Sequence, residues 1–421
     1  MGDVAPPALE TLSEGCGPLL SSAREAGRTL RQEVFEYVRA HGQAARADVT
    51  DALKISAGST TTITADLIAS GFLHEVEGRT RESGRGRPRI ALKVTADAAY
   101  VIGIKLAFKR HTAVLTDFAG NLIGSQTLTA TDMRRPVAQL VDETAMLVSQ
   151  LLEAHGKKIS DIATIGVGLP GIVDHKTKQC LWSSLLLTQD EHLAGMLSLR
   201  LQTPVVLDND ANMLTLAELW FGAGRELADF AVVTIESGVG MGLVLGNKLY
   251  RGAHGKGLEL GHTKVEMDGA LCQCGRRGCL EAYLADFALI REATTALDHR
   301  FDTSESPEHI LETLFAEAKA GNPAALGIFR RAGRYLALGL SNVIQLFDPA
   351  LICLSGGQMR YECLYADDVL QEMHRLALDD GRKPCKVTFN MWDDLVWARG
   401  ASAQALASTT DMLIGGEARA V

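Results

Sequence analysis

One histidine and three cysteines stand close together in the middle of the chain and could hold a metal ion. They occur in the pattern Gly-His-x9-Cys-x-Cys-Gly-x2-Gly-Cys, with His262, Cys272, Cys274 and Cys279 as the potential ligands. A neutral imidazole and three thiolates form the ligand set of a closed tetrahedral zinc site. Four protein ligands leave no coordination position for an activated water, so the pattern predicts a structural zinc with any chemistry beside it. The alternative is that the four side chains never meet.

Two acids, Glu259 and Glu281, flank this cluster. Residues 259–262 (Glu-Leu-Gly-His) and 272–281 (Cys-Gln-Cys-Gly-Arg-Arg-Gly-Cys-Leu-Glu) resemble the signature of the ROK family of repressors, open reading frames and sugar kinases. The resemblance implies a carbohydrate pocket in which His262 binds zinc through one ring nitrogen and faces a sugar hydroxyl with the other, while both acids contact the sugar. It also implies two similar lobes of the actin-like ATPase and hexokinase type.

The composition is that of an ordinary soluble globular protein. Of the 421 residues, 47% are hydrophobic and 22% are charged, which is enough for two or three domains that each bury a core. No apolar run reaches the roughly 18 to 20 residues that span a bilayer, and the N-terminus does not have the pattern of a signal peptide. The five cysteines outside the cluster lack the spacing of a disulfide framework. We therefore expect a cytoplasmic protein without membrane insertion.

The N-terminal part differs in charge from the rest of the chain. Residues 1–95 hold twelve basic and twelve acidic side chains, so residues 96–421 carry the whole net charge of −9. Residues 1–22 lack periodicity and are predicted to form a mobile tail. Residues 23–95 predict a winged helix-turn-helix, with a helix ending at Gly42, a short helix at 49–53, a turn at Ala57-Gly58, a third helix at 59–69, and two strands between 72 and 94.

The third helix begins with hydroxyl side chains that could read DNA, namely Ser59, Thr60, Thr61, Thr62 and Thr64. Such residues are poor helix formers, and short hydroxyls at the start of a recognition helix can bond phosphates and base edges in the major groove. The alternative is a capping run before an ordinary helix.

The predicted wing carries the one strongly basic stretch of the chain. Its tip reads Ser-Gly-Arg-Gly-Arg-Pro-Arg (residues 83–89). Glycine lets an extended backbone lie deep in a narrow minor groove, whose negative potential attracts the guanidinium groups of Arg85 and Arg87. Taken alone, this motif is more often a solvated linker. Behind a helix-turn-helix it predicts binding to double-stranded operator DNA, and it resembles the wing of the family's repressor branch.

From residue 97, apolar runs alternate with amphipathic helices, which predicts α/β architecture with ligands at the carboxyl ends of the strands. Strands are predicted at residues 99–106, 111–117, 162–167, 205–207, 230–235 and 351–354, and a helix at 137–152. By the resemblance, residues 96–421 form the sugar-binding and oligomerisation domain. Its lobe boundary is expected near Asp208, and C-terminal helices, including residues 325–347, are expected to return to the first lobe.

Asn209 and Asp210 follow the strand at residues 205–207, where amide and carboxylate groups can bond sugar hydroxyls. A capping or turn role is the alternative. The resemblance implies that Asp210 matches the base that deprotonates the sugar in the family's kinases, and that Asn209 binds a neighbouring hydroxyl. It also implies that Gly171, in the loop at residues 168–174, closes over the same sugar.

The family's kinases carry Asp-x-Gly-Gly-Thr at their metal-phosphate site, and this chain does not. Residues 105–109 are Lys-Leu-Ala-Phe-Lys, so Lys105 replaces the acid, and Ala107 and Phe108 replace the glycines. In a second loop, residues 236–242, Glu236 stands where the family usually has glycine, and its carboxylate would repel phosphate. We expect no catalytic residue and no enzymatic activity.

Together these features predict a sugar-responsive transcriptional regulator, a repressor of carbohydrate genes. A monosaccharide or sugar derivative in the interlobe cleft would change its affinity for the operator. We expect a homodimer or a dimer of dimers, because two recognition helices must reach half-sites about one helical turn, or a multiple of it, apart. Two alternatives stay open: an ATP-dependent sugar kinase with a DNA-binding appendage, and a repressor that a transport protein sequesters.

Overall fold

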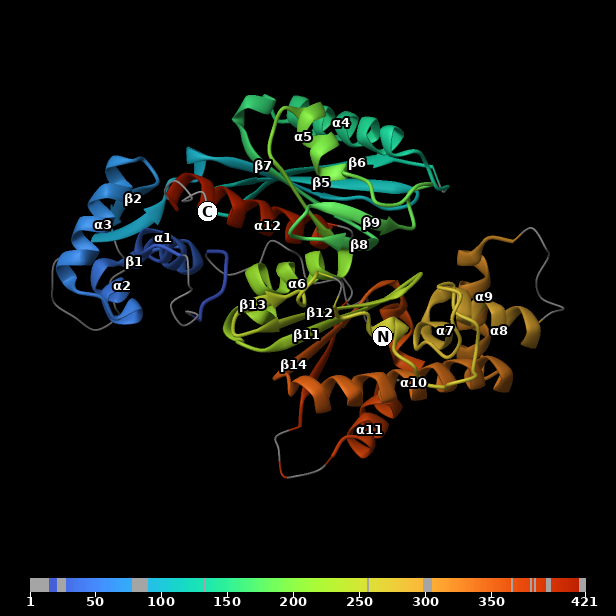
Figure 1. The fold of residues 1–421 in the computed structure, drawn as a ribbon. Helices are drawn as coiled ribbons and strands as arrows, with labels where there is room; N and C mark the ends of the chain where they lie inside the picture. Colours follow the sequence, from blue (N-terminus) through green and yellow to red (C-terminus); the bar gives the residue numbers. More distant parts are fainter. Residues whose placement is uncertain are drawn as a thin grey trace. The chain divides into compact units, whose positions relative to one another are not determined.

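The computed structural model describes residues 15–20, 28–77, 90–131, 133–255, 257–297, 305–364, 366–378, 381, 384–390 and 395–415. The chain forms two compact units (Figure 1). The first comprises Met1–Ala228, Val244–Lys256 and Asp393–Val421, and the second comprises Asp229–Leu243 and Gly257–Trp392. The predicted α/β class is confirmed. Within the described ranges, no helix is both long and apolar enough to cross a membrane.

A winged helix-turn-helix opens the first unit. Its helices are α1 (Leu30–His41), α2 (Arg46–Leu53) and α3 (Ala57–Ala69), and its strands β1 (Ala44–Ala45), β2 (Leu73–Glu77) and β3 (Ile90–Val94) form an antiparallel sheet in the order β1-β3-β2. Helix α3 begins earlier than predicted, because the Ser56 side chain caps it by accepting from the Ser59 N–H. Ala57 and Gly58 are therefore helical and do not form the predicted turn.

The rest of the first unit is built on a five-stranded sheet in the order β10-β7-β4-β5-β6. Its strands are β4 (Tyr100–Lys105), β5 (Arg110–Asp117), β6 (Leu122–Thr129), β7 (Ile162–Leu169) and β10 (Val205–Asn209), of which β4, β7 and β10 run parallel. Helices α4 (Val137–Ala154) and α5 (Leu193–Leu201) cover one face, and α12 (Leu395–Ile414) covers the other and packs on α6 (Asp210–Phe221) (Figure 1). Strands β8 (Gly171–Asp174) and β9 (Gln179–Ser183) form a separate hairpin.

Helix α12 packs so closely on the sheet that there is no room for a side chain at two strand positions. A Cβ atom added at Gly103 of β4 would lie 2.0 Å from the Ala398 carbonyl oxygen, and one at Gly166 of β7 would lie 2.0 Å from that of Ala401. Both positions therefore require glycine. Helix α12 is the C-terminal helix that returns to the first unit, whereas residues 325–347, for which the same was predicted, belong to the second unit.

Within the first unit, the winged helix-turn-helix is joined to the rest through α1 and α12. Gln32 Nε2 donates a hydrogen bond to Asp411 Oδ1 over 2.8 Å, and Arg39 Nη1 donates to Thr410 Oγ1 over 2.8 Å. The second of these contacts is buried, so it is shielded from competition by water.

The second five-stranded sheet has the order β13-β12-β11-β14-β15. Its strands are β11 (Phe230–Ile235), β12 (Val239–Leu245), β13 (Lys248–Tyr250), β14 (Leu351–Ser355) and β15 (Lys386–Asn390); β13 and the end of β12 are counted with the first unit. The helices of the second unit are α7 (Glu281–Leu284), α8 (Asp286–Ala296), α9 (Pro307–Lys319), α10 (Pro323–Phe347) and α11 (Ala366–Leu376). Short 3-10 turns are η2 (Ala96–Ala98), η3 (Ile159–Asp161), η4 (Ala223–Glu226), η5 (Leu260–His262) and η7 (Gly357–Leu364).

Candidate metal and effector sites

The four predicted metal ligands meet in the second unit. One ring nitrogen of His262 and the sulfur atoms of Cys272, Cys274 and Cys279 all lie within 4.8 Å of one another. The Cys272 sulfur is 3.9 Å from His262 Nδ1, and the Cys274 and Cys279 sulfurs are 3.7 Å apart. The alternative that the four side chains never meet is wrong. A metal ion could bind between them.

Two glycines produce the turns that bring the cysteines together. Gly275 has a φ of +80° and Gly278 a φ of +75°, a region that favours glycine. A Cβ atom at Gly278 would also lie 1.6 Å from the Glu266 carbonyl oxygen. The turn is closed by the Cys272 N–H, which donates to the Arg276 carbonyl oxygen over 2.9 Å.

The electrostatics of the cluster suit a cation. Burial raises the pKa of the Cys272 thiol, so without an ion this side chain stays protonated at neutral pH. A bound cation would favour the thiolate, because the ligand form of cysteine is the deprotonated one. Lys264 Nζ lies 2.7 Å from the Cys279 sulfur, where its positive charge would stabilise a thiolate further.

Glu281 connects the cluster to the neighbouring strand. Its buried carboxylate accepts from the Val239 N–H at Oε2 over 3.1 Å and from the Cys272 thiol at Oε1 over 3.4 Å. Glu259 is exposed and precedes η5, and its carbonyl oxygen accepts from the His262 N–H over 3.0 Å. The Glu281 carboxylate is therefore held by a cysteine of the cluster, whereas Glu259 is linked to the cluster through its backbone carbonyl.

The other predicted sugar residues lie in the first unit, around the carboxyl end of β10. Asn209 Oδ1 caps α6 by accepting from the Asn212 N–H over 2.8 Å, which is the capping role that the sequence left open. Asp210 is the first residue of α6, and its Oδ1 accepts from the next N–H over 2.9 Å. Gly171 has a φ of +149°, and a Cβ atom there would lie 2.2 Å from the Trp182 carbonyl oxygen.

Asp208 lies directly before the candidate sugar residues, and the sequence did not single it out as a site residue. Its buried carboxylate accepts from Arg251 Nε over 2.7 Å and from Asn212 Nδ2 over 2.7 Å. Because Asn212 also bonds Asn209, the ion pair with Arg251 helps to position the Asn209 side chain. Arg251 is 43 residues away in the chain, so no local motif could reveal the pair.

The hydroxyl run of α3 divides between two faces of the helix. Thr60 and Thr64 are 0% exposed, so the prediction that they contact DNA is wrong. Thr60 Oγ1 lies 2.8 Å from Thr50 Oγ1, and Thr64 Oγ1 accepts from Arg46 Nε over 2.9 Å, which ties α3 to α2. The residues of the run that face solvent are Thr61 and Thr62, with Ser59 half-buried.

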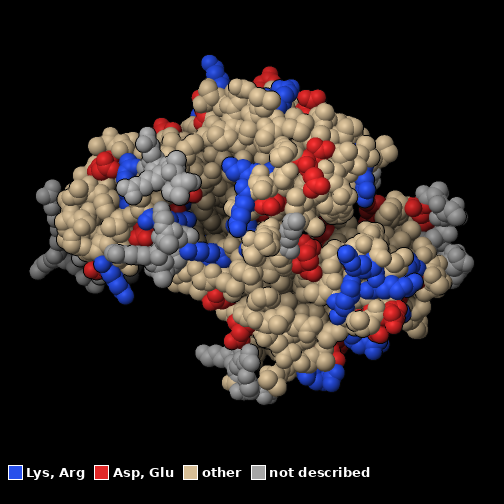
Figure 2. Space-filling view, in the orientation of Figure 1, with Lys and Arg blue, Asp and Glu red and all other residues tan. Residues whose placement is uncertain are grey.

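The wing tip, with Arg85 and Arg87, lies outside the described residues. On the face of the molecule drawn in Figure 2, basic and acidic side chains form small separate groups. The described strands β2 and β3 pair from Leu73 with Val94 to Glu77 with Ile90, so they form the base of the predicted wing.

The sequence model of the ROK family matches residues 101–408 of this chain. The chain belongs to the ROK family. It is similar to the xylose repressor of Caldicellulosiruptor bescii, with 26% identity over 318 residues that cover 73% of this chain and 78% of the relative. It is also similar to the DNA-binding transcriptional dual regulator NagC of Escherichia coli, with 27% identity over 341 residues that cover 80% of this chain and 81% of the relative.

Two solved structures have the same fold. One is a ROK family transcriptional regulator, a homologue of the Escherichia coli Mlc protein, with a TM-score of 0.76 and 23% identity over 92% of this chain and 98% of that chain. The other is a ROK family glucokinase from Streptomyces griseus in complex with glucose and AMPPNP, with a TM-score of 0.62 and 28% identity over 73% of this chain and 99% of that chain. Both regulators and kinases are thus ROK relatives, and family membership alone does not decide whether the chain is an enzyme.

In this ROK protein, the end of β4 and the loop after it are bonded to, and packed against, other parts of the first unit. Lys105 is buried, with Nζ 3.9 Å from the centroid of the Trp397 ring. The Ala107 N–H donates to His111 Nδ1 over 3.2 Å, and Phe108 packs against the core of the unit. This backbone donor is therefore already engaged within the loop.

The loop between β11 and β12 is also engaged internally. The Glu236 carboxylate accepts from the Gly357 N–H over 3.2 Å, at the first residue of η7. Its backbone N–H donates to the Gly238 carbonyl oxygen over 2.9 Å. The Glu236 carboxylate thus binds one backbone donor at this loop.

Proposed function

We propose that this ROK protein is a sugar-responsive DNA-binding transcriptional regulator that does not phosphorylate its effector. The observation that carries the proposal is the combination of a winged helix-turn-helix with a ROK domain in which backbone donors at the two candidate phosphate loops bond the side chains of His111 and Glu236. The names of the relatives support it, since they include a xylose repressor and a DNA-binding transcriptional regulator.

The absence of turnover follows from the physics of phosphoryl transfer, which depends on metal ions and donors placed around the phosphates. At the first loop, the Ala107 N–H bonds His111, and Lys105 stands where the family's kinases have an acid. At the second loop, Glu236 would place a negative charge beside a phosphate. A kinase in which Asp210 is the base is the rival hypothesis.

The proposed effector is a monosaccharide or a sugar derivative. We assign its contacts to Gly171, Asn209 and Asp210 of the first unit and to Glu259, His262 and Glu281 of the second. Carboxylates, amides and an imidazole suit this role, because each forms directional hydrogen bonds with hydroxyl groups.

The proposed metal is a structural zinc held by His262, Cys272, Cys274 and Cys279. The ion would supply four bonds that fix the loop from which Glu259 and Glu281 are presented. A closed coordination shell leaves the ion no role in activating water.

The proposed DNA contacts come from the exposed end of α3 and from the wing. Thr61, Thr62 and the half-buried Ser59 would meet base edges or phosphates in the major groove, and Arg85 and Arg87 would enter the adjacent minor groove. We also propose that the protein acts as a homodimer or a dimer of dimers in the cytoplasm, because paired half-sites require two recognition helices.

Isothermal titration of the zinc-loaded protein against a panel of monosaccharides tests the proposal, with operator binding measured at each sugar that binds. The expected result is saturable binding of one sugar, a change in operator affinity at the same concentrations, and no consumption of ATP. Sugar-dependent ATP consumption would favour the kinase. An operator response that needs a transport protein and no sugar would favour sequestration.

A further inference from the structure

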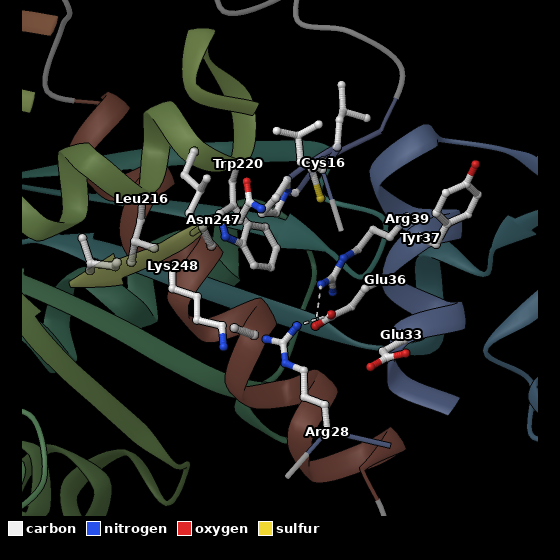
Figure 3. Close-up of a pocket in the computed structure, with 18 of the residues that line it drawn as sticks. Cys16, Arg28, Glu33, Glu36, Tyr37, Arg39, Leu216, Trp220, Asn247 and Lys248 are labelled. Carbon is white, nitrogen blue, oxygen red and sulfur yellow. Dashed lines mark hydrogen bonds and ion pairs between the residues drawn. The ribbon is translucent and has the colours of Figure 1, made fainter. Parts of the chain in front are cut away.

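The first unit contains a cavity of about 660 Å³ between the winged helix-turn-helix and the rest of the unit (Figure 3). The lining comes from residues 16–20, helix α1 and the end of α2, and from α6, β13 and α12. This volume lies within the range of small-molecule sites, roughly 300 to 1,000 Å³. None of the side chains assigned above to metal, sugar or DNA lines the cavity.

The cavity wall holds buried polar atoms whose hydrogen-bonding capacity is unused. Gln404 of α12 is only 7% exposed, and among the described residues neither its Nε2 nor its Oε1 has a hydrogen-bond partner. The same is true of Asn247 Oδ1 and of Arg39 Nε, which belong to two other lining residues. Buried polar groups are almost always paired, so four such atoms around one cavity indicate that molecules inside the cavity, either waters or a ligand that displaces them, supply the missing bonds.

The lining carries an excess of positive charge, although the whole chain has a net charge of −9. Its basic residues are Arg28, Arg39, Lys54, Lys248 and Arg251, and its acids are Glu33 and Glu36. Figure 3 shows Arg28 just before α1, Arg39 in α1 and Lys248 in β13 around the cavity. Glu36 pairs with both Arg28 and Arg39, and Arg251 pairs with Asp208, which does not line the cavity. The five basic residues still outnumber Glu33, Glu36 and Asp208. The lining therefore favours a ligand with an anionic group.

Much of the remaining wall is apolar, although Tyr37 and His41 also line it. Leu216, Leu219 and Trp220 of α6 and Leu249 of β13 line the cavity. A planar ring can cover such a surface with its faces and keep its polar atoms on the edge. A sugar phosphate, with a hydroxyl on almost every carbon, would leave several hydroxyls unpaired against these side chains.

We propose that this cavity is a second ligand site, which takes a nucleoside monophosphate. The amide of Gln404 can pair with the donor and acceptor on one edge of a nucleobase, as glutamine and asparagine do with adenine. The leucines contact the base, and the phosphate lies near the cationic side chains at the mouth.

The site connects the DNA-binding elements to the sugar-binding domain. A ligand there contacts α1 and also α6, whose first residue is Asp210 and whose last turn contains Trp220. A nucleotide that binds two arrangements of these helices with different affinity would shift operator affinity by the same ratio. This inference does not depend on the identity of the sugar effector.

The test is isothermal titration of the full-length protein with AMP and UMP, with glucose 6-phosphate as the comparison. We expect at least one nucleotide to bind, and Gln404→Leu to weaken that binding by about tenfold or more through the loss of two hydrogen bonds. Ala407→Phe, which fills the cavity, should abolish binding. Asp210→Asn should leave nucleotide binding intact, so a failure of the sugar proposal would be distinguishable.

The midpoint of thermal unfolding shows whether the Gln404→Leu and Ala407→Phe variants are folded. Gln404→Leu removes buried polar atoms that have no partner in the described structure, so its unfolding midpoint should not fall below that of the wild type. The proposal is overturned if neither nucleotide binds, if both variants bind as the wild type does, or if glucose 6-phosphate binds as tightly as the nucleotide.

Discussion

Thr60 and Thr61 are neighbours in sequence with opposite environments, and they form a matched pair for the DNA-binding face. Thr60 is buried and bonded to Thr50, whereas Thr61 is exposed. Thr60→Val should destabilise the protein by about 0.5 to 1.5 kcal/mol, the cost of a lost hydrogen bond. Thr61→Val should change stability by less than about 0.5 kcal/mol and instead alter the preference among operator sequences. Chemical denaturation and binding to an operator library measure the two effects.

Cys274 allows the metal to be removed with little direct damage to the core, because its side chain is exposed. Cys274→Ala should lose zinc and then sugar binding, since the loop that presents Glu259 and Glu281 would no longer be fixed. The control is Cys385→Ala, a cysteine of the same unit outside the cluster. Metal content and sugar titration are the measurements. A Cys274 variant that lacks zinc yet binds sugar with wild-type affinity would contradict the coupling.

The metal ligands could be predicted at the residue scale because their spacing is local and their chemistry is distinctive. The burial of Thr60 and Thr64 could not, because it depends on which face of α3 meets α2, and five hydroxyl residues in a row carry no polar-apolar contrast. The pair of Asp208 with Arg251 forms only after the chain has folded back.

At the scale of the elements, the close docking of α12 gives a test by glycine replacement. Gly166→Ala would place a Cβ atom 2.0 Å from the Ala401 carbonyl oxygen, so the helix must shift, at a cost of about 1 to 3 kcal/mol. Gly195→Ala is the matched control, because Gly195 lies in α5 with open space around it. It should stabilise the protein by about 0.5 to 1 kcal/mol. Thermal unfolding that ranks the two variants in the opposite order would contradict the described packing.

The sequence predicted the strands of strong apolar character and helix α4, but it missed β6, β12, β15 and the role of α12. Strand β6 alternates exposed and half-buried residues and so lacks an apolar run. Helix α12 is buried along most of its length and rich in small residues, so it shows no single apolar stripe from which its partner could be inferred. Backbone contact with Gly103 and Gly166, far away in the chain, is what places it.

At the scale of the whole molecule, the winged helix-turn-helix belongs to the same unit as the first part of the ROK domain. The bonds from α1 to α12 join the winged helix-turn-helix to this unit, and α6 of the same unit begins at the candidate sugar residue Asp210. A sugar that changes the position of α6 would therefore act on a body that includes the recognition helix.

The family and the fold class could be predicted from the sequence, because the metal motif and the basic wing are continuous segments.

This linkage makes a prediction for the junction itself. Asp411→Ala removes the acceptor of the Gln32 side chain at the contact between α12 and α1. Sugar affinity should stay within about twofold of the wild type, because a distant surface contact contributes little to the sugar site. The change in operator affinity on adding sugar should shrink, as seen in fluorescence anisotropy of labelled operator with and without sugar. An undiminished sugar response would show that the coupling does not pass through this contact.

The most direct test of the central claim, sugar sensing without turnover, is Asp210→Asn, measured by sugar titration, ATP consumption and operator binding on the same preparations. The wild type should consume no ATP in the presence of sugar. The variant should bind sugar about 1.5 to 3 kcal/mol more weakly, the range for a hydrogen bond to a charged group, and should keep operator affinity but lose the response to sugar. Phosphorylation by the wild type that is lost in the variant with sugar affinity preserved would contradict the account and identify a kinase.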